Sequence, residues 1–306
     1  MNIAQLSKAL SPSSGACTGQ RQRASGFVFC RLQAPIWIWN VIFVIYTHVI
    51  SISTLFLYRP SKDLLLLTFL FWSISSIGIT MGYHRLWSHR SYTATFILRI
   101  LLAALGTLGF QGSIKWWSER HRLHHRFTDT KHDPYNAKRG FWFSHMGWIF
   151  YKQHYTKLPS IDISDLTRDS GKNNTCKFDF TSFAFVVVRF QHQHYVPLAL
   201  MLGFILPTFI AWCLWDDALG GFLYGGHLAK IISWHTTFCI NSFAHWLGSQ
   251  DYSLQFTARG NLLLALLTHG EGKFRSTYLL YLDYWLRTSQ LSSRISTRLP
   301  KWNPMV

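Results

Sequence analysis

The sequence predicts an all-α integral membrane protein in which four transmembrane helices carry a cytosolic helical cap with histidine boxes. Three observations support this fold class. Several apolar stretches approach membrane-spanning length, since about 20 mostly apolar residues cross a hydrocarbon layer of roughly 30 Å. The chain is 49% hydrophobic and 17% aromatic, as is typical of proteins that meet the membrane interface. Two clusters of histidines also follow one of the apolar stretches.

Four stretches are predicted to span the membrane, namely residues 36–58, 64–81, 195–215 and 218–240. The fourth is interrupted by His227, Lys230 and His235, although its aromatic and aliphatic content still favours a buried helix. A fifth stretch, 97–110, is shorter. We expect it to lie in the interface or within the helix bundle.

Basic residues predict the orientation of these spans. Residues 82–194 hold sixteen Lys or Arg against seven Asp or Glu, and the residues after 240 hold seven against three. By the positive-inside rule, both termini and the long segment face the cytosol. The net charge of +17 is spread among long apolar stretches rather than gathered in a basic tract. This distribution argues against nucleic acid as a partner and favours the lipid bilayer.

Three regions are expected along the chain. Residues 1–35 contain basic residues and serines but no acid, and we predict a disordered cytosolic tail, with a transit peptide as the alternative. Residues 36–272 form the membrane domain, and residues 273–306 form a divergent tail that is moderately apolar. The five cysteines have no C-x-x-C spacing, so no disulfide framework is predicted.

Five histidines within about forty residues predict a metal site, because clustered neutral imidazoles without cysteine suit iron, zinc, copper or nickel. On a helix, His121, His124 and His125 project within an arc of roughly 100°, so that one helix presents three ligands. His84 and His89 are five residues apart, about 140° around a helix. They suit either two ions or one ion with a helix end between them. The alternative is a set of interfacial histidines without a ligand role.

A further pair follows the fourth apolar stretch. Asn241 and His245 are four residues apart, which places them on one face of a helix. Taken alone, His245 is more typical of an ordinary polar residue at a helix end.

Long motifs then resemble the acyl-CoA Δ9 desaturases, the stearoyl-CoA desaturase family, and its fungal members in particular. The resemblance covers residues 36–272. Its motifs lie at residues 82–92 (GYHRLWSHRSY), 116–117 (WW), 121–129 (HRLHHRFTD), 133–134 (DP), 139–148 (RGFWFSHMGW) and 241–248 (NSFAHWLG).

This resemblance implies a di-iron enzyme of the endoplasmic reticulum membrane. In that family two iron ions are held by nine histidines and a water-linked asparagine, and electrons from cytochrome b5 activate O2. A cis double bond is then introduced into a saturated fatty acyl-CoA held in a bent apolar tunnel. Carried over by motif, the ligands are His84, His89, His121, His124, His125 and His245, with Asn241 acting through water.

Other roles are also implied. Asp129 and Asp133 resemble acids that orient ligand imidazoles, with exposed charge as the alternative. Arg120 and Lys152 are predicted to bind the coenzyme A phosphates, with general attraction to the membrane surface as the alternative. Residues expected to line the acyl tunnel, or otherwise to be core aromatics, are Trp116, Trp117 and Phe238.

The chain departs from the family after Gly270-Glu271-Gly272. The family continues with an aromatic residue and a third box, His-Asn-aromatic-His-His, whereas this chain continues from Lys273 with no histidine after His269. A third of the ligand set is missing, and a changed reading frame or an unspliced intron is one hypothesis for the difference. Electrons are expected from a separate cytochrome b5 and its reductase.

Three functions therefore remain open. The first is a Δ9 desaturase impaired by the missing ligands. The second is a non-catalytic desaturase paralogue or truncated product, and the third is a histidine-box lipid hydroxylase. A haem electron carrier is disfavoured, because bis-histidine haem ligands face each other within a bundle, whereas these clusters follow the spans.

Overall fold

The computed structural model describes residues 35–152, 159–167, 180–250 and 256–270. Within these ranges the chain is helical, and its only extended pairings are isolated bridges from Ile36 to Tyr151 and from Ser249 to Gly260. The predicted tails, 1–35 and 273–306, lie outside the described residues apart from Pro35.

Three helical runs are long and apolar enough to cross a membrane. The first is α1 (Ile38–Leu57). The second joins α2 (Lys62–Ile77) to the π-helix η2 (Gly78–Ser88), and so continues past its predicted end. The third joins α8 (Tyr195–Leu200), η7 (Met201–Ile205) and α9 (Leu206–Trp215). These three runs correspond to the first three predicted spans.

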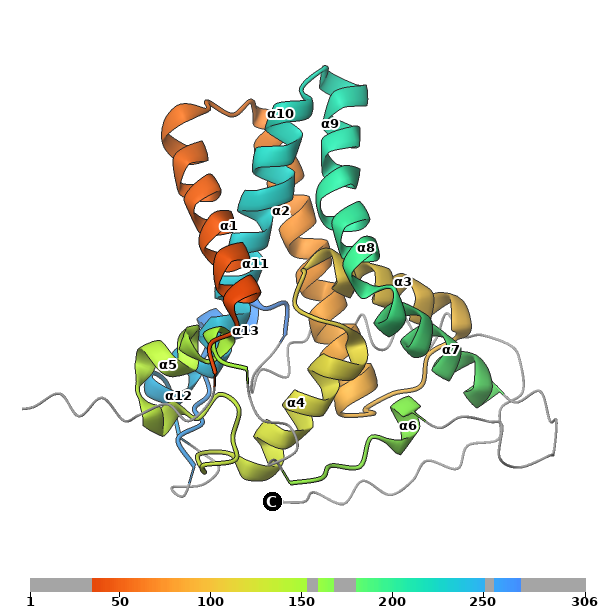
Figure 1. Cartoon of the computed structure of the whole chain (residues 1–306), viewed down its shortest axis with the longest axis vertical. Coiled ribbons are helices and arrows are strands. Elements are labelled where there is room, and N and C mark those ends of the chain that lie inside the picture. The colour runs from red at the N-terminus through yellow and green to blue at the C-terminus, as the bar shows by residue number, and fades with distance from the viewer. Residues whose placement is uncertain (1–34, 153–158, 168–179, 251–255, 271–306) are drawn as a thin grey trace, which may run out of the picture. The chain divides into compact units, whose positions relative to one another are not determined.

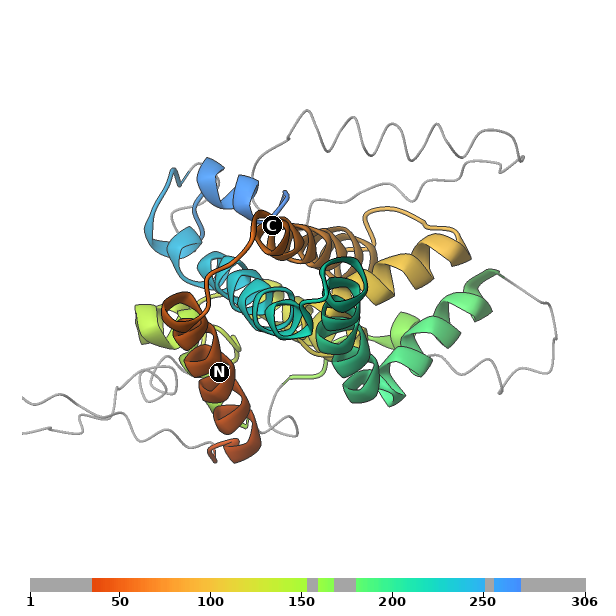
Figure 2. The ribbon, with the colours of Figure 1, turned by 90° about the horizontal axis from the view of Figure 1, so that it is seen from above.

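The fourth predicted span is helical but is not among these three runs. It consists of α10 (Ala218–Gly220), η8 (Gly221–Leu228) and α11 (Ala229–Asn241). Figures 1 and 2 show this run beside α2, among the other long helices. The difference from the prediction has a simple cause, because His227, Lys230 and His235 interrupt its apolar sequence.

Helix α1 turns small and polar residues inward. Its buried residues are Val44, Thr47, Ser51 and Thr54, at alternating spacings of three and four. Large apolar residues, including Ile45, lie exposed on its other sides. Small and hydroxyl-bearing residues at contacts, with aliphatic residues outward, are typical of helices that pack within lipid.

Helix α3 (Phe96–Leu108) is the shorter apolar helix. It crosses the end of α2 so closely that a Cβ atom at Gly78 would overlap the backbone of Gly106. Leu102, Ala103 and Leu108 of α3 are buried, while Ile97 is exposed. The helix is therefore partly packed in the bundle, which is one of the two predicted positions for residues 97–110.

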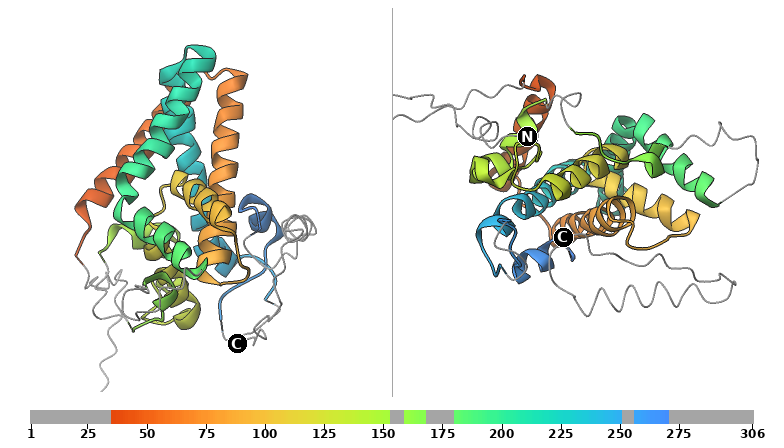
Figure 3. Two further views of the ribbon diagram at one scale, coloured as in Figure 1. Left: turned by 90° about the vertical axis from the view of Figure 1, so that its right-hand side faces the viewer. Right: turned by 90° about the horizontal axis from the view of Figure 1, so that it is seen from below.

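Shorter helices gather at one end of the long ones (Figures 1 and 3). Helix α4 (Ile114–Phe127) carries three of the predicted ligands. The other short elements are η3 (Ala137–Arg139), α5 (Phe141–His145), η4 (Gly147–Phe150), α6 (Ser164–Thr167), α7 (Phe180–Gln193), α12 (Phe243–Trp246) and α13 (Leu262–Leu267).

Candidate metal centre

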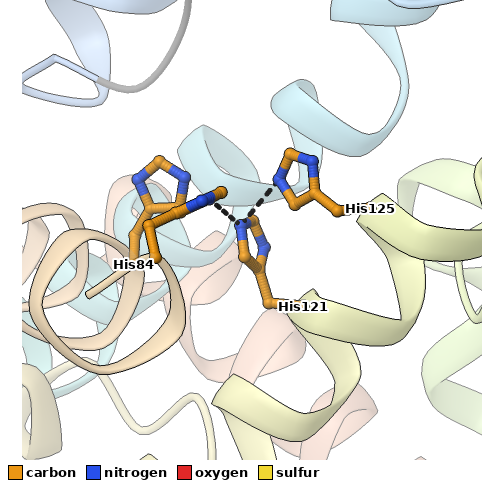
Figure 4. A group of neighbouring side chains, drawn as sticks. His84, His121 and His125 are labelled. Carbon is orange, nitrogen blue, oxygen red and sulfur yellow. Dashed lines mark hydrogen bonds between the residues drawn. The ribbon is translucent and has the colours of Figure 1, made fainter. Parts of the chain in front are cut away.

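Four histidines form one cluster, which we call the four-histidine cluster. His84 and His89 come from the end of η2, and His121 and His125 come from α4. One nitrogen from each ring lies within 4.8 Å of the others. Nε2 of His121 lies 2.9 Å from Nε2 of His89 and 2.9 Å from Nε2 of His125. Figure 4 shows His84, His121 and His125 gathered in one place, with the two close contacts of His121 drawn as dashed lines.

The π-helix explains how residues five apart meet. In η2 the backbone bonds run between residues i and i+5, and the N–H of His89 donates to the carbonyl of His84 at 2.9 Å. Five residues therefore make about one turn, and the two ring centroids are 4.5 Å apart. The predicted helix end also lies here, since His89 follows the last residue of η2.

Arg122 fixes this helix end to α4. Its guanidinium donates to the carbonyls of Trp87 and Ser88 at 2.6 and 3.2 Å. It also donates to both carboxylate oxygens of Asp165 on α6 at 2.8 Å. Arg90 forms a second ion pair with Asp165. The two helices that supply the cluster are thus joined by a charged contact beside it.

The electrostatics of the four-histidine cluster favour neutral rings. Burial, followed by the neighbouring imidazoles, lowers the pKa of His121 well below its ordinary value. Burial and then the Arg122 charge lower the pKa of His89. Two N···N contacts also converge on one nitrogen of His121, although a ring nitrogen carries either a hydrogen or a lone pair. A metal ion would take one lone pair from each ring, so these residues fit a transition metal such as iron.

His124 lies apart from this cluster and faces His245, with ring centroids 5.7 Å apart. We call this pair the two-histidine site. Nδ1 of His124 donates to Asp133 Oδ1 at 2.8 Å. Nδ1 of His245 lies 2.7 Å from Oγ1 of Thr257, and that hydroxyl donates to Asp129 at 2.7 Å. Both rings therefore hold their proton on Nδ1, and Nε2 is the nitrogen that each would offer to a metal.

The three histidines of α4 are therefore divided between two positions. Helix α4 presents all three rings, but toward two positions rather than one. His121 and His125 are four residues apart and share a face, whereas His124 is 100° away from His125 around the helix. It points toward Asp133 and toward His245 on α12 instead.

The two positions are not equally complete. Among the described residues, the two-histidine site has two imidazoles, with Asn241 at the nearby end of α11. The sequence contains no histidine after His269. The residues present fit one ion at the four-histidine cluster, but they form only part of a coordination sphere at the second position.

A cavity of about 800 Å³ adjoins both positions. His84, His121, His124, His125, Asn241 and His245 contribute to its wall, whereas His89 does not appear there. The predicted tunnel residues Trp116, Trp117 and Phe238 also line it, together with Phe43, Phe110, Trp148 and Trp234. Such a volume with an apolar lining and a few polar groups is typical of a small-molecule site.

The two predicted phosphate-binding residues have different surroundings. Arg120 is buried, lines the cavity and lies 3.6 Å over the ring of Trp116. Burial lowers its pKa to about 9. Lys152 is exposed, and its backbone N–H donates to the carbonyl of Pro35. Arg120 therefore faces the ligand space, whereas Lys152 faces outward.

Sequence reasoning missed three further histidines. His48 of α1, His145 of α5 and His235 of α11 are joined by ring-to-ring contacts of 3.0 Å. They stand far apart in the sequence, so no short motif groups them. Two signals were present in the sequence: the motif at residues 139–148 contains His145, and His235 is one of the residues that interrupt the fourth apolar stretch.

Curated proteins similar to this chain are desaturases. It is 41% identical over 220 residues to a protein named probable acyl-CoA desaturase from Schizosaccharomyces pombe, covering 72% of this chain and 43% of that protein. It is 40% identical over 210 residues to acyl-CoA desaturase 1 of Saccharomyces cerevisiae, covering 69% and 38%. Human stearoyl-CoA desaturase 5 is 35% identical over 253 residues, covering 81% and 72%.

The chain thus spans less than half the length of the two yeast relatives and almost three quarters of the human one. No family model matches the chain.

Proposed function

Because the chain belongs to the acyl-CoA desaturase family of oxidoreductases, we propose that it is built to place a cis double bond at the Δ9 position of a saturated fatty acyl-CoA. The observation that carries this proposal is the cavity. One apolar space adjoins both groups of histidines, so an acyl chain within it would pass beside both candidate metal positions.

In this proposal the aromatic side chains hold the acyl chain and exclude water. Trp116, Trp117 and Phe238 supply apolar walls, and Arg120 supplies a fixed cation for the coenzyme A end. Asp133 keeps the His124 proton on Nδ1, and Asp129 does the same for His245 through Thr257. Bound iron would supply the activation of O2, with electrons from a separate cytochrome b5 and its reductase.

We propose that the four-histidine cluster takes the first iron and that His124, His245 and water-linked Asn241 take the second. The second position has fewer ligands, so its affinity for iron should be lower. The desaturase activity of this chain should therefore be impaired. The unequal number of ligands at the two positions also favours a second candidate function, that of a non-catalytic desaturase paralogue that binds acyl-CoA. A lipid hydroxylase of the same histidine-box type is distinguished by its product.

The membrane arrangement belongs to the same proposal. The chain would cross the endoplasmic reticulum membrane four times, with α10–η8–α11 as the fourth span and both termini and the metal positions in the cytosol. Glycosylation tags placed in the turns after α1 and α9 test this arrangement. Both turns should be modified, and tags at either terminus should not.

The function is tested by expressing the full chain in yeast that lacks its own Δ9 desaturase, with product analysis and iron determination on the purified protein. A matched chimera replaces residues 273–306 with the segment that follows the Gly-Glu-Gly sequence in the Saccharomyces cerevisiae relative. We expect about one iron and little growth for the chain, and two irons with Δ9 products for the chimera. A folded chimera that binds acyl-CoA and two irons without forming unsaturated product would contradict a desaturase.

A further inference from the structure

A line of hydrogen-bonded groups connects α1, α11 and α5 away from the metal ligands. It begins at the carbonyl of Val44, which lies 2.7 Å from Nδ1 of His48. Nε2 of His48 lies 3.0 Å from Nε2 of His235, and Nδ1 of His235 lies 3.0 Å from Nε2 of His145. We call His48, His235, His145 and Ser242 the imidazole chain.

The other end of the imidazole chain is also a carbonyl. Nδ1 of His145 lies 2.9 Å from Oγ of Ser242, and that hydroxyl donates to the carbonyl of Phe238 at 2.9 Å. Ser242 and His145 are buried. The imidazole chain therefore runs between two groups that can only accept hydrogen bonds.

Counting hydrogens shows that the neutral groups are one short. Five contacts join the chain from Val44 to Phe238, and each needs one hydrogen. A neutral imidazole carries one N–H and a serine one O–H, so three rings and one hydroxyl supply four. In the neutral state, two lone pairs must face each other at one of the five contacts.

We propose that the imidazole chain binds one additional proton, shared among His48, His235 and His145. With that proton all five contacts are complete. The arrangement selects a proton over a metal ion, because His235 contacts His48 through Nε2 and His145 through Nδ1. The three rings therefore share no common point, whereas a transition metal takes about four ligands around one centre. The observed 3.0 Å between nitrogens is the length of an N–H···N hydrogen bond.

Neighbouring groups have opposite effects on the affinity of the imidazole chain for this proton. Burial lowers the pKa of His145 below its ordinary value. The ring of Phe141 stacks on His145 at 5.6 Å, and the C-terminal end of α11 carries the negative end of a helix dipole. Both features favour a cation there. The fifth hydrogen bond favours it further, since a buried polar group left without a partner is destabilising.

Among the described residues, no acid on the adjoining helices neutralises the charge. The described helices α1, α5, α11, α12, η3, η4 and η8 contain no Asp or Glu, and the acid of α2, Asp63, lies in its first turn. Their titratable groups are otherwise Tyr46, Lys62, Lys138, Arg139, Tyr224, His227, Lys230, Cys239 and His245. Lys230 donates to the carbonyls of Gly203 and Gly226, and Arg139 lies over the ring of Phe143.

Ser242 connects the imidazole chain to the two-histidine site. Its carbonyl accepts the N–H of His245 at 2.9 Å, and it follows Asn241 directly. His145 and Ser242 are therefore positioning residues for the corner between α11 and α12. This inference does not depend on the proposed activity.

The test is a ¹⁵N NMR measurement of histidine rings in the full chain in lipid nanodiscs at about pH 7.5, one unit above the ordinary imidazole pKa of about 6.5. Ring nitrogen shifts distinguish a doubly protonated ring from the two neutral tautomers. We expect one imidazolium equivalent in the wild type, assigned to the imidazole chain by its loss on substitution.

Two variants equalise the number of contacts and the number of hydrogens in the neutral imidazole chain, each by removing a different group. Ser242→Ala leaves three contacts and three hydrogens, and His48→Phe also leaves three contacts and three hydrogens. Both should lose the imidazolium signal completely, whereas His192→Gln, a histidine bonded to Ser113 instead, should retain it. Neutral rings at all three positions in the wild type, or persistence of the signal in either folded variant, would overturn the proposal.

Discussion

The four-histidine cluster and the two-histidine site hold their imidazoles by different means. In the cluster the rings lie against one another, with Nε2 atoms 2.9 Å apart. At the two-histidine site each ring is oriented by a carboxylate, directly from Asp133 or through Thr257 from Asp129. The difference suggests that the first position depends on how two helices meet, and the second on loops that follow α4.

The largest effect is expected from removing a shared ring of the cluster. His121→Ala deletes the nitrogen on which both close contacts converge. Removing a residue that only hydrogen-bonds to a ligand lowers metal affinity roughly 10–100-fold. Removing the His121 ring itself should lower the affinity by more than this. Competition with a chromophoric chelator for Co²⁺ measures this affinity. His124→Ala is the matched control on the same helix, and an equal loss in both variants would show that the two positions are not distinct.

Next in size is the effect of an orienting acid at the two-histidine site. Asp133→Asn preserves shape but weakens the contact that holds the proton of His124 on Nδ1. Affinity for the second metal ion should fall about 10–100-fold, while the first binding step should not change. Zinc titration of the iron-free chain followed by calorimetry separates the two steps. A change confined to the first step would contradict the assignment.

A smaller effect is expected at the contact that fixes the end of η2. Asp165→Asn removes the charge that both Arg122 and Arg90 contact, but Arg122 still reaches the carbonyls of Trp87 and Ser88. Because this residue acts through Arg122, we expect about a tenfold loss of Co²⁺ affinity at the four-histidine cluster. The visible absorption of bound Co²⁺ should change with it, and Asp165→Glu should restore both.

The long helices and the four-histidine cluster could largely be predicted from the sequence, because each is marked by a pattern within one short segment. The three longest apolar runs gave their helices directly, and the motifs around His84 and His121 located the cluster. The division of His124 from His121 could not be predicted, since helical spacing alone places all three rings of α4 within one arc. It depends on Asp133 and on His245, which lies on α12 and is brought near by tertiary packing.

The π-helix and the imidazole chain were beyond sequence reasoning for related reasons. Residues five apart were expected about 140° apart on an α-helix, and only the i to i+5 bonding of η2 brings His84 and His89 together. The contact of His48 with His235 and His145 joins three separate elements. No periodicity within one segment reports such a contact.

The smallest effect should come from Arg90, which tests whether the cluster depends on buried or exposed charge. The Arg90 side chain is 50% exposed, whereas that of Arg122 is 11% exposed, although both contact Asp165. Exposed ion pairs contribute about 0–1 kcal/mol, so Arg90→Gln should change Co²⁺ affinity less than about fivefold. Arg122→Gln removes the bonds to η2 as well and should cost more. If Arg90→Gln matched Arg122→Gln, the carbonyl contacts of Arg122 would not be what holds His84 and His89 in place.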